Sequence, residues 1–259
     1  MTSITREQRR DWSSTGKWVD SCIEPNFRGE ILTFFHMNLS TIHAFPIMGE
    51  VLRPENTLPL DFTEANEALA EVNLSDTTKF NAFVFGQMQT AEKKYGVGGY
   101  LEKRAIYRRS EVFATESSNF RNIHLGVDIW AAAGSPVYAP LAGKIHSFQD
   151  NVGFGNYGPT LILSHQLGEK TLHSLYGHLS STSLSSVEVG REVSAGERIC
   201  EIGPFPENGD WPPHLHFQLI WDMGDFWGDY PGVAAEKDLD FYLENCPDPG
   251  LWIGKFKEA

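Results

Sequence analysis

The sequence predicts a mainly β protein, in which an antiparallel β-sheet domain over residues 110–225 follows a mixed α/β region over residues 1–109. Two observations predict it. After about residue 105, short apolar and β-branched segments alternate with Gly, Pro and Asn, which is typical of all-β units. Before that point, apolar residues recur at helical spacing. The last segment, residues 226–259, is rich in Trp, Tyr, Gly and Pro, and we expect it to wrap the β domain.

The N-terminal region contains one expected strand, one loop and two helices. An apolar run at residues 31–35 predicts the strand, and the Pro- and Asn-bearing stretch 46–59 predicts the loop. Residues 61–72 and 76–95 have helical patterning, with side chains that can cap each helix. The glycines that follow residue 95 are expected to end the second helix.

The β domain divides into short strands separated by turn residues. The segment Gly168-Glu169-Lys170 reads as a hairpin loop between two of them. We expect strands at residues 125–130, 136–139, 143–148, 160–165, 171–178, 197–203 and 214–221.

Composition and charge restrict the class of function. The chain has 259 residues, 41% of them hydrophobic, which is a globular composition. Its net charge of -13 repels phosphate backbones and anionic lipids, so we do not expect nucleic-acid binding. The three cysteines, Cys22, Cys200 and Cys246, form no CxxC pair. Neither a disulfide framework nor a thiolate zinc site is therefore expected.

The compartment is inferred from two missing patterns. The first residues lack the apolar core of a secretory signal, and no apolar run reaches the roughly 18 residues of a transmembrane segment. We therefore expect a cytoplasmic protein without a transmembrane segment. The alternative is the cell envelope, reached by a non-standard route.

Two short histidine motifs carry the candidate chemistry. His124 and Asp128 form a His-x-x-x-Asp motif, and His214 and His216 form a His-x-His motif about 90 residues later. On strands, residues two or four apart share a face, so His214, His216 and Gln218 point one way, as do His124 and Asp128. Imidazoles and a carboxylate that leave a fourth position for water are typical of a catalytic zinc site.

Three ordered segments resemble the signatures of the lysostaphin/LytM-type zinc metallopeptidases. They are His-Leu-Gly-Val-Asp at 124–128, Tyr-Gly-His-Leu at 176–179 and Pro-His-Leu-His-Phe at 213–217. The connecting sequence at 133–145 and 189–203 agrees with that family, and the resemblance covers about residues 120–221. Three motifs in order are far more specific than any one of them.

The resemblance implies both a fold and a set of residue roles. The fold would be an antiparallel β-sheet catalytic domain of the duplicated-hybrid-motif type. One Zn²⁺ would be held by His124, Asp128 and His216, while His178 and His214 would be the unligated catalytic pair. Zinc lowers the pKa of its bound water to about 7, and a neighbouring imidazole can take or return a proton. The sequence has no helical HExxH motif, which leaves the acid-base role to the two spare histidines.

We therefore expect a zinc-dependent metalloendopeptidase that hydrolyses peptide bonds in peptidoglycan-type or related peptides. The alternative is a catalytically silent zinc- or peptide-binding regulatory module in the same groove. A third hypothesis is that the N-terminal region covers the groove as an inhibitory segment. The chain departs from the family at 206–213, where many members have a Gly-Ser/Thr-Gly turn, so substrate preference transfers less well than the metal site.

Some polar residues near the motifs keep other interpretations. His165 and His173 lie on the predicted hairpin and are interpreted as structural. The aromatic residues Tyr107 and Phe113 are assigned to core packing rather than to a peptide groove. The sequence leaves a set of arginines open, either as contacts to a substrate carboxylate or as solvated side chains: Arg104, Arg108, Arg109 and Arg121.

Overall fold

The computed structural model describes residues 39, 41–113 and 120–253. The predicted strand at 31–35 lies outside these residues, as does Cys22. The chain divides into two units, Met1–Thr41 and Ile42–Ala259, and the description below concerns the second. Within the described ranges, no helix combines the length and apolar character needed to cross a membrane.

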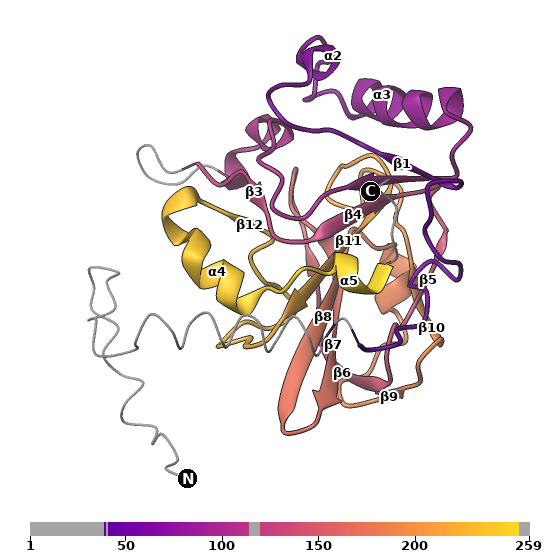
Figure 1. Cartoon of the computed structure of the whole chain (residues 1–259), viewed down its shortest axis with the longest axis vertical. Helices are drawn as coiled ribbons and strands as arrows, with labels where there is room; N and C mark the ends of the chain where they lie inside the picture. Colours follow the sequence, from indigo (N-terminus) through magenta and orange to yellow (C-terminus); the bar gives the residue numbers. More distant parts are fainter. Residues whose placement is uncertain (1–38, 40, 114–119, 254–259) are drawn as a thin grey trace. The chain divides into compact units, whose positions relative to one another are not determined.

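An eight-stranded sheet forms the centre of this unit (Figure 1). All its neighbouring strands pair antiparallel except the first two, which are parallel. The predicted mainly β fold with an antiparallel sheet is therefore confirmed. In spatial order the strands are β1 (Thr57–Pro59), β2 (Tyr95–Gly98), β4 (Val127–Trp130), β11 (His214–Ile220), β8 (Lys170–Gly177), β7 (Gly158–Leu167), β6 (Gly143–Asn151) and β9 (Glu192–Val193).

Two small sheets complete the β structure. In one, β5 (Pro136–Tyr138) pairs with β10 (Arg198–Glu201). In the other, β3 (Ile123–His124) pairs with β12 (Val233–Ala234). The second pairing comes from the C-terminal segment, which was expected only to wrap the β domain. That segment instead supplies the partner strand for His124.

The helices are short, apart from one that packs on the aromatic core. α3 (Thr77–Thr90) is capped at its N-terminus by Asp76, whose side chain accepts from Lys79 N at 3.2 Å. Its buried side chains include Phe80 and Val84, which pack beside Trp130 of β4. The others are α2 (Glu67–Ala70), α4 (Leu239–Asn245) and α5 (Gly250–Ile253), with 3₁₀ turns η2 (Ile106–Arg109), η3 (Glu111–Phe113), η4 (Ser181–Leu184) and η5 (Glu236–Asp238).

The N-terminal region differs from its prediction in three places. The helix predicted at 61–72 is reduced to α2, because Asp61 accepts from Thr63 N and Asn66 donates to Asp61 O, and such local bonds compete with a helix. The predicted loop 46–59 contains β1. The helix predicted at 76–95 ends at Thr90, and Tyr95, the last residue of that prediction, begins β2.

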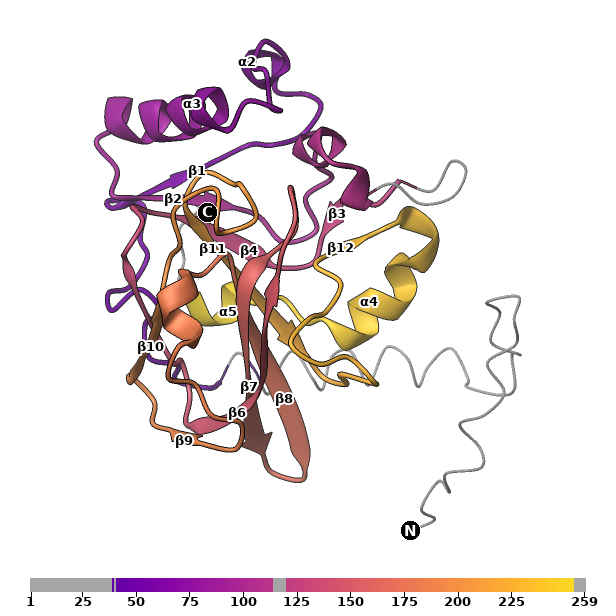
Figure 2. The same cartoon turned by 180° about the vertical axis from the view of Figure 1, so that it is seen from behind.

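These differences place part of the N-terminal region directly beside the motif strands. β2 pairs with β4, so that Gly98 lies opposite Asp128. In Figures 1 and 2, α3 lies on the same side as β1, whereas β7 and β8 form a long hairpin that extends away from them. The middle of the sheet, β4 with β11, carries the motif residues.

Candidate metal centre

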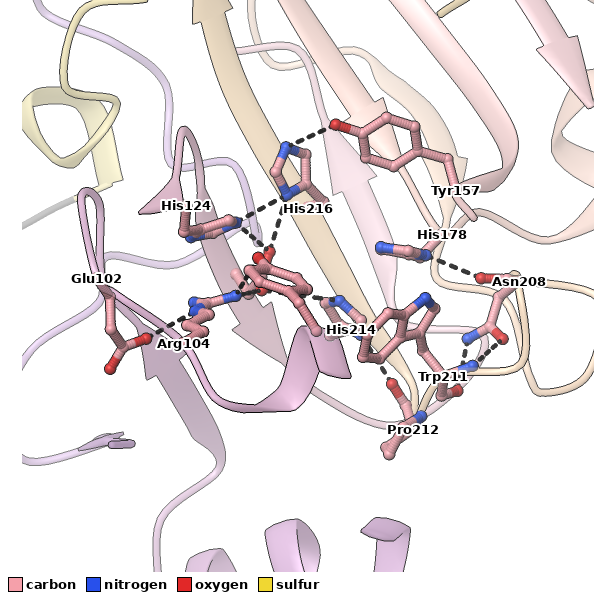
Figure 3. Close-up of polar contacts among 12 residues, drawn as sticks. Glu102, Arg104, His124, Tyr157, His178, Asn208, Trp211, Pro212, His214 and His216 are labelled. Carbon is pink, nitrogen blue, oxygen red and sulfur yellow. Dashed lines mark hydrogen bonds and ion pairs between the residues drawn. The ribbon is translucent and has the colours of Figure 1, made fainter. Parts of the chain in front are cut away.

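Strand register brings the two histidine motifs together. β11 and β4 pair so that His216 lies opposite Asp128 and His214 lies opposite Trp130. On the other side of β11, Gly177 of β8 lies opposite His216, and His178 follows it directly. The sheet therefore converges all the predicted site residues on one region, which Figure 3 shows in close-up.

The three predicted zinc ligands form a compact, buried cluster. His124 Nε2 lies 3.0 Å from His216 Nδ1 and 3.2 Å from Asp128 Oδ1. The remaining pair of atoms, His216 Nδ1 and Asp128 Oδ1, is 3.0 Å apart. Within the part of the chain that the structure describes, these residues form a group that could hold a metal ion. Their role as ligands remains a prediction.

His124 and Asp128 reach the cluster by a different route from the one predicted. They do not share one strand, because strand structure is interrupted at Leu125 and Gly126, between β3 and β4. At Gly126 a Cβ atom would come within 2.7 Å of the His216 ring and of the Phe217 carbonyl oxygen. The glycine therefore permits His216 to approach the turn, and the turn directs His124 back toward Asp128.

Hydrogen bonds turn the protons of the His124 and His216 imidazoles away from the cluster. His124 Nδ1 donates to the Gly99 carbonyl oxygen at 3.0 Å. His216 Nε2 donates to Gln218 Oε1 at 3.0 Å, and the amide orientation of Gln218 is assigned by its own donation to Pro231 O at 3.1 Å. His124 Nε2 and His216 Nδ1 consequently face each other as lone pairs.

This arrangement fits a divalent cation. Burial, followed by the nearby Arg104, lowers the pKa of His124 to about 4, so its ring is neutral at pH 7. Although burial opposes ionisation, nearby charge, including that of Arg104, holds the pKa of the Asp128 carboxyl well below its usual range. Two lone pairs and a carboxylate oxygen then meet with no proton among them. Two imidazole nitrogens and one carboxylate oxygen are a donor set that zinc prefers.

His178 and His214, the predicted catalytic pair, lie next to this cluster. Their ring centroids are 4.2 Å apart, and His214 stacks on Trp130 at 4.1 Å. His178 Nδ1 donates to Asn208 O and His214 Nδ1 donates to Pro212 O, both at 2.8 Å. Each ring therefore keeps Nε2 without a proton. Burial lowers the pKa of His214 to about 4 and that of His178 well below its usual value.

The backbone at His178 is held in an unusual conformation. Its φ of 61° lies in the left-handed region, which residues other than glycine rarely adopt. The loop at 206–213, where the chain departs from the family, fixes this residue. Asn208 is fully buried; its amide nitrogen donates to Gly203 O and Trp211 O, and its amide oxygen accepts from Trp211 N. The backbone carbonyl that accepts the hydrogen bond of His178 is therefore rigidly placed. Figure 3 shows the His178 ring between Tyr157 and His214.

A cavity of about 300 Å³ opens onto the histidines. Several aromatic side chains line it, as is common for ligand sites. Tyr107 and Phe113, which were assigned to core packing, are buried in the aromatic core and also line this cavity. Polar groups in the lining include Arg121 and Asp229, and burial raises the pKa of Asp229.

Sequence reasoning missed several residues that hold the site. Gln218 was placed on the face of the two histidines, yet its bond to His216 was not predicted. Tyr157, whose phenol oxygen lies 3.3 Å from His216 Nε2, gave no sequence signal. Arg104 was left open as a possible substrate contact, and it bonds instead to Asp128. His165 and His173 lie outside the metal cluster, and each bonds to a backbone carbonyl.

The family comparison agrees with this geometry. Residues 122–226 match the model of peptidase family M23. The match confirms the resemblance that the three motifs predict, and it covers less than half of the chain. The same segment contains the His-Asp-His cluster that could hold a metal ion. No curated protein matches the chain.

Several solved structures are similar to part of the chain. The putative peptidase M23 from Pseudomonas aeruginosa is 20% identical over 69% of this chain and 63% of that one, with a TM-score of 0.35. The catalytic domain of the antimicrobial peptidase lysostaphin from Staphylococcus simulans is 26% identical over 47% and 80%, with a TM-score of 0.32. A zinc-containing peptidase from Vibrio cholerae is 24% identical over 41% and only 30%, with a TM-score of 0.30.

Proposed function

We propose that the protein is a zinc-dependent metalloendopeptidase that hydrolyses peptide bonds in peptidoglycan-type or related peptides. One observation carries the proposal. Three buried ligand atoms, from His124, Asp128 and His216, lie within 3.2 Å of one another with their protons turned away. Such a cluster is unfavourable without a cation, because buried lone pairs and a carboxylate oxygen repel one another.

The ligand set would leave room for chemistry. His124 Nε2, Asp128 Oδ1 and His216 Nδ1 would hold zinc through three protein ligands, the number typical of catalytic rather than closed structural sites. When bound, zinc supplies Lewis acidity, which lowers the pKa of a water molecule to about 7 and polarises a peptide carbonyl.

The two remaining histidines would move the protons. The Nε2 atoms of His178 and His214 carry no proton, and both rings line the cavity. A neutral imidazole can take a proton from the attacking water and return it to the leaving amine. The carbonyls of Asn208 and Pro212 keep each ring in the tautomer that this role requires. Asp128 Oδ2 lies 3.9 Å from His214 Nε2 and would stabilise the protonated, positively charged form of the His214 ring.

The substrate class rests on the family and on the cavity. The M23 match supports a peptide substrate, and the resemblance of the three motifs to the lysostaphin/LytM-type metallopeptidases is the basis for a peptidoglycan-type peptide. A cavity of about 300 Å³ next to the cluster, lined by several aromatic side chains, suits a peptide segment rather than a folded protein.

Mass spectrometry of a muropeptide panel tests the proposal. The panel contains cross-linked D-amino-acid peptides and glycine bridges, incubated with zinc-loaded wild type, His214→Ala, His216→Ala and an exposed-histidine control, His43→Ala. We expect cleavage by wild type and the control, retained zinc without turnover for His214→Ala, and loss of both for His216→Ala.

Three outcomes would contradict the proposal. Failure of wild type to retain zinc would show that the three residues do not form a zinc site. Tight binding of a peptide by the zinc-loaded protein, with no cleavage over long incubation, would favour the silent binding module. Full activity of His214→Ala would exclude that residue from the mechanism.

A further inference from the structure

A fully buried arginine contacts the carboxylate of the candidate metal cluster. The Arg104 side chain has no exposed surface. Its Nη1 donates to Asp128 Oδ2, and its Nε donates to Glu102 Oε2 at 2.7 Å. Figure 3 shows Glu102 and Arg104 in line beside His124. The two oxygens of Asp128 thus have different partners, since Oδ1 faces the two imidazoles and Oδ2 faces the guanidinium.

The surroundings of Arg104 are shaped to hold a guanidinium. The rings of Phe62 and Tyr107 lie 5.4 and 5.8 Å from its central carbon, and Tyr107 also accepts from Nη1 at 3.1 Å. At Gly98 a Cβ atom would come 2.4 Å from Nη2, so only glycine leaves space there. Because a buried ion pair generally contributes little net stability, stabilisation of the fold alone does not account for this construction.

We infer that Arg104 is a positioning residue that makes Asp128 a one-oxygen metal ligand. This inference rests on the proposed function. A carboxylate can bind a metal through one oxygen or through both. With Oδ2 engaged by Arg104, only Oδ1 is offered to the cluster. A coordination position that a second oxygen would take therefore stays open for water or for a substrate carbonyl.

Glu102 completes this device by balancing charge. A cation beside a metal site opposes metal binding, because like charges repel strongly in a buried environment. The carboxylate of Glu102 offsets the charge of Arg104 on the side away from the cluster. Glu102 is itself fixed, since its Oε1 accepts from Phe62 N at 3.2 Å. The arginine can therefore orient Asp128 without adding net positive charge.

The chain offers a matched control for testing Arg104. Arg109 is also buried, at 8% exposure, and lies 4.5 Å from the rings of Phe154 and Trp211. Its Nη2 donates to Thr77 Oγ1 and Asp210 O, and it does not bond to the cluster. Replacement of either arginine by methionine removes a buried guanidinium of the same size. Only the Arg104 change removes the contact with Asp128.

Zinc affinity, measured by chelator competition, and the visible absorption spectrum of the Co²⁺-loaded protein are the readouts. For Arg104→Met we expect zinc affinity to fall roughly 10–100-fold and the Co²⁺ spectrum to shift as the coordination changes. Arg104→Lys keeps the charge and one contact, and we expect an intermediate loss. Glu102→Gln leaves the charge of Arg104 uncompensated, so zinc affinity falls while the Co²⁺ spectrum keeps its shape. Arg109→Met leaves both readouts as in wild type.

Each contrary result has a separate meaning. Equal zinc affinity and spectrum in Arg104→Met and wild type would overturn the inference, as would an equal loss in Arg109→Met. If Arg104→Met does not fold, wild-type zinc affinity in both Arg104→Lys and Glu102→Gln would overturn it. A wild type that retains no zinc overturns the proposed function and this inference together. A wild type that retains zinc and cleaves no peptide overturns the proposed function alone.

Discussion

The side-chain oxygen of Gln218 lies 3.0 Å from Nε2 of His216, two residues earlier on the same face of β11. The Gln218 amide nitrogen donates to Pro231 O, and it also lies 3.4 Å from Cys246 Sγ. Residues of the C-terminal segment therefore fix the orientation of the Gln218 amide. The amide oxygen in turn determines which nitrogen of His216 carries the proton. This relationship links the C-terminal segment to the metal cluster.

Replacement of Gln218 is expected to weaken metal binding. Gln218→Met removes the acceptor for His216 Nε2–H, so the ring can rotate or change tautomer. We expect zinc affinity to fall roughly 10–100-fold, as is typical when the partner of a ligating histidine is lost. Chelator competition measures the change. Gln166→Met, at the exposed β7–β8 hairpin, is the control. An unchanged affinity in Gln218→Met would show that the tautomer is set by another group.

Two glycine-to-alanine changes are expected to have opposite effects. In Gly126→Ala the new Cβ meets the His216 ring and the Phe217 carbonyl at 2.7 Å, so we expect a loss of about 1–3 kcal/mol in the free energy of unfolding, with weaker zinc binding. In Gly86→Ala, within α3, the Cβ meets nothing within 4 Å, and we expect a gain of about 0.5–1 kcal/mol. Denaturant unfolding of both variants measures these changes. A well-folded Gly126→Ala with full zinc affinity would refute the close-approach argument.

Removal of the metal is expected to destabilise the protein. An ion that binds only the native state, present at 100 times its dissociation constant, raises the free energy of unfolding by about 2.7 kcal/mol. Wild type should therefore melt at a higher temperature with zinc than after chelation. The melting temperature of His216→Ala should be the same with zinc and after chelation. Thermal unfolding monitored by circular dichroism distinguishes the two, and a zinc-dependent shift in His216→Ala would mean that the ion binds elsewhere.

Acid is expected to destabilise the fold through His173, which lies away from the metal cluster. Burial, followed by the neighbouring His146, lowers the pKa of His173 to about 4. Since the unfolded chain binds this proton near pH 6.5, the contribution of the neutral ring to stability is complete above pH 6.5 and declines as the pH falls toward 4. In this interval His173→Gln should lose less stability than wild type, by up to about 1.4 kcal/mol per pH unit.

Denaturant unfolding at several pH values measures this difference. Exposed His43→Gln serves as the control, because it removes a histidine that is not buried. Equal pH dependence in His173→Gln and wild type would show that His173 does not contribute to acid sensitivity.

The sequence predicted which candidate residues lie together better than it predicted the residues that support them. The ligand and catalytic candidates lie in short motifs that can be recognised without the fold, and the structure places these residues together. The continuous strand from His124 to Asp128 was wrong, because a glycine that looked neutral in the pattern provides a turn for His216. Arg104 could not be assigned, since its contact with Asp128 spans 24 residues and no local pattern distinguishes a buried arginine from a solvated one.

The same limit applies to the fold of the N-terminal region. β1 and β2 are short and contain Pro or Gly, so their propensity for strand is low. Their structure depends on pairing, of β2 with β4 and of β1 with β2. The main strands of the sheet were predictable because their apolar patterns are long. Their partners at the edge were not.

The pairing of β2 with β4 determines where the protein can be truncated without loss of the candidate metal centre. The family match begins at residue 122, but the acceptor for the His124 proton is Gly99, and Arg104 and β2 also precede that boundary. A fragment trimmed to 122–226 would lose these groups and the C-terminal strand that pairs with His124. Deletion up to residue 105 would likewise dismantle the centre, whereas deletion of residues 1–41 leaves every one of these contacts in place. The inhibitory-segment hypothesis is therefore best tested with the shorter deletion.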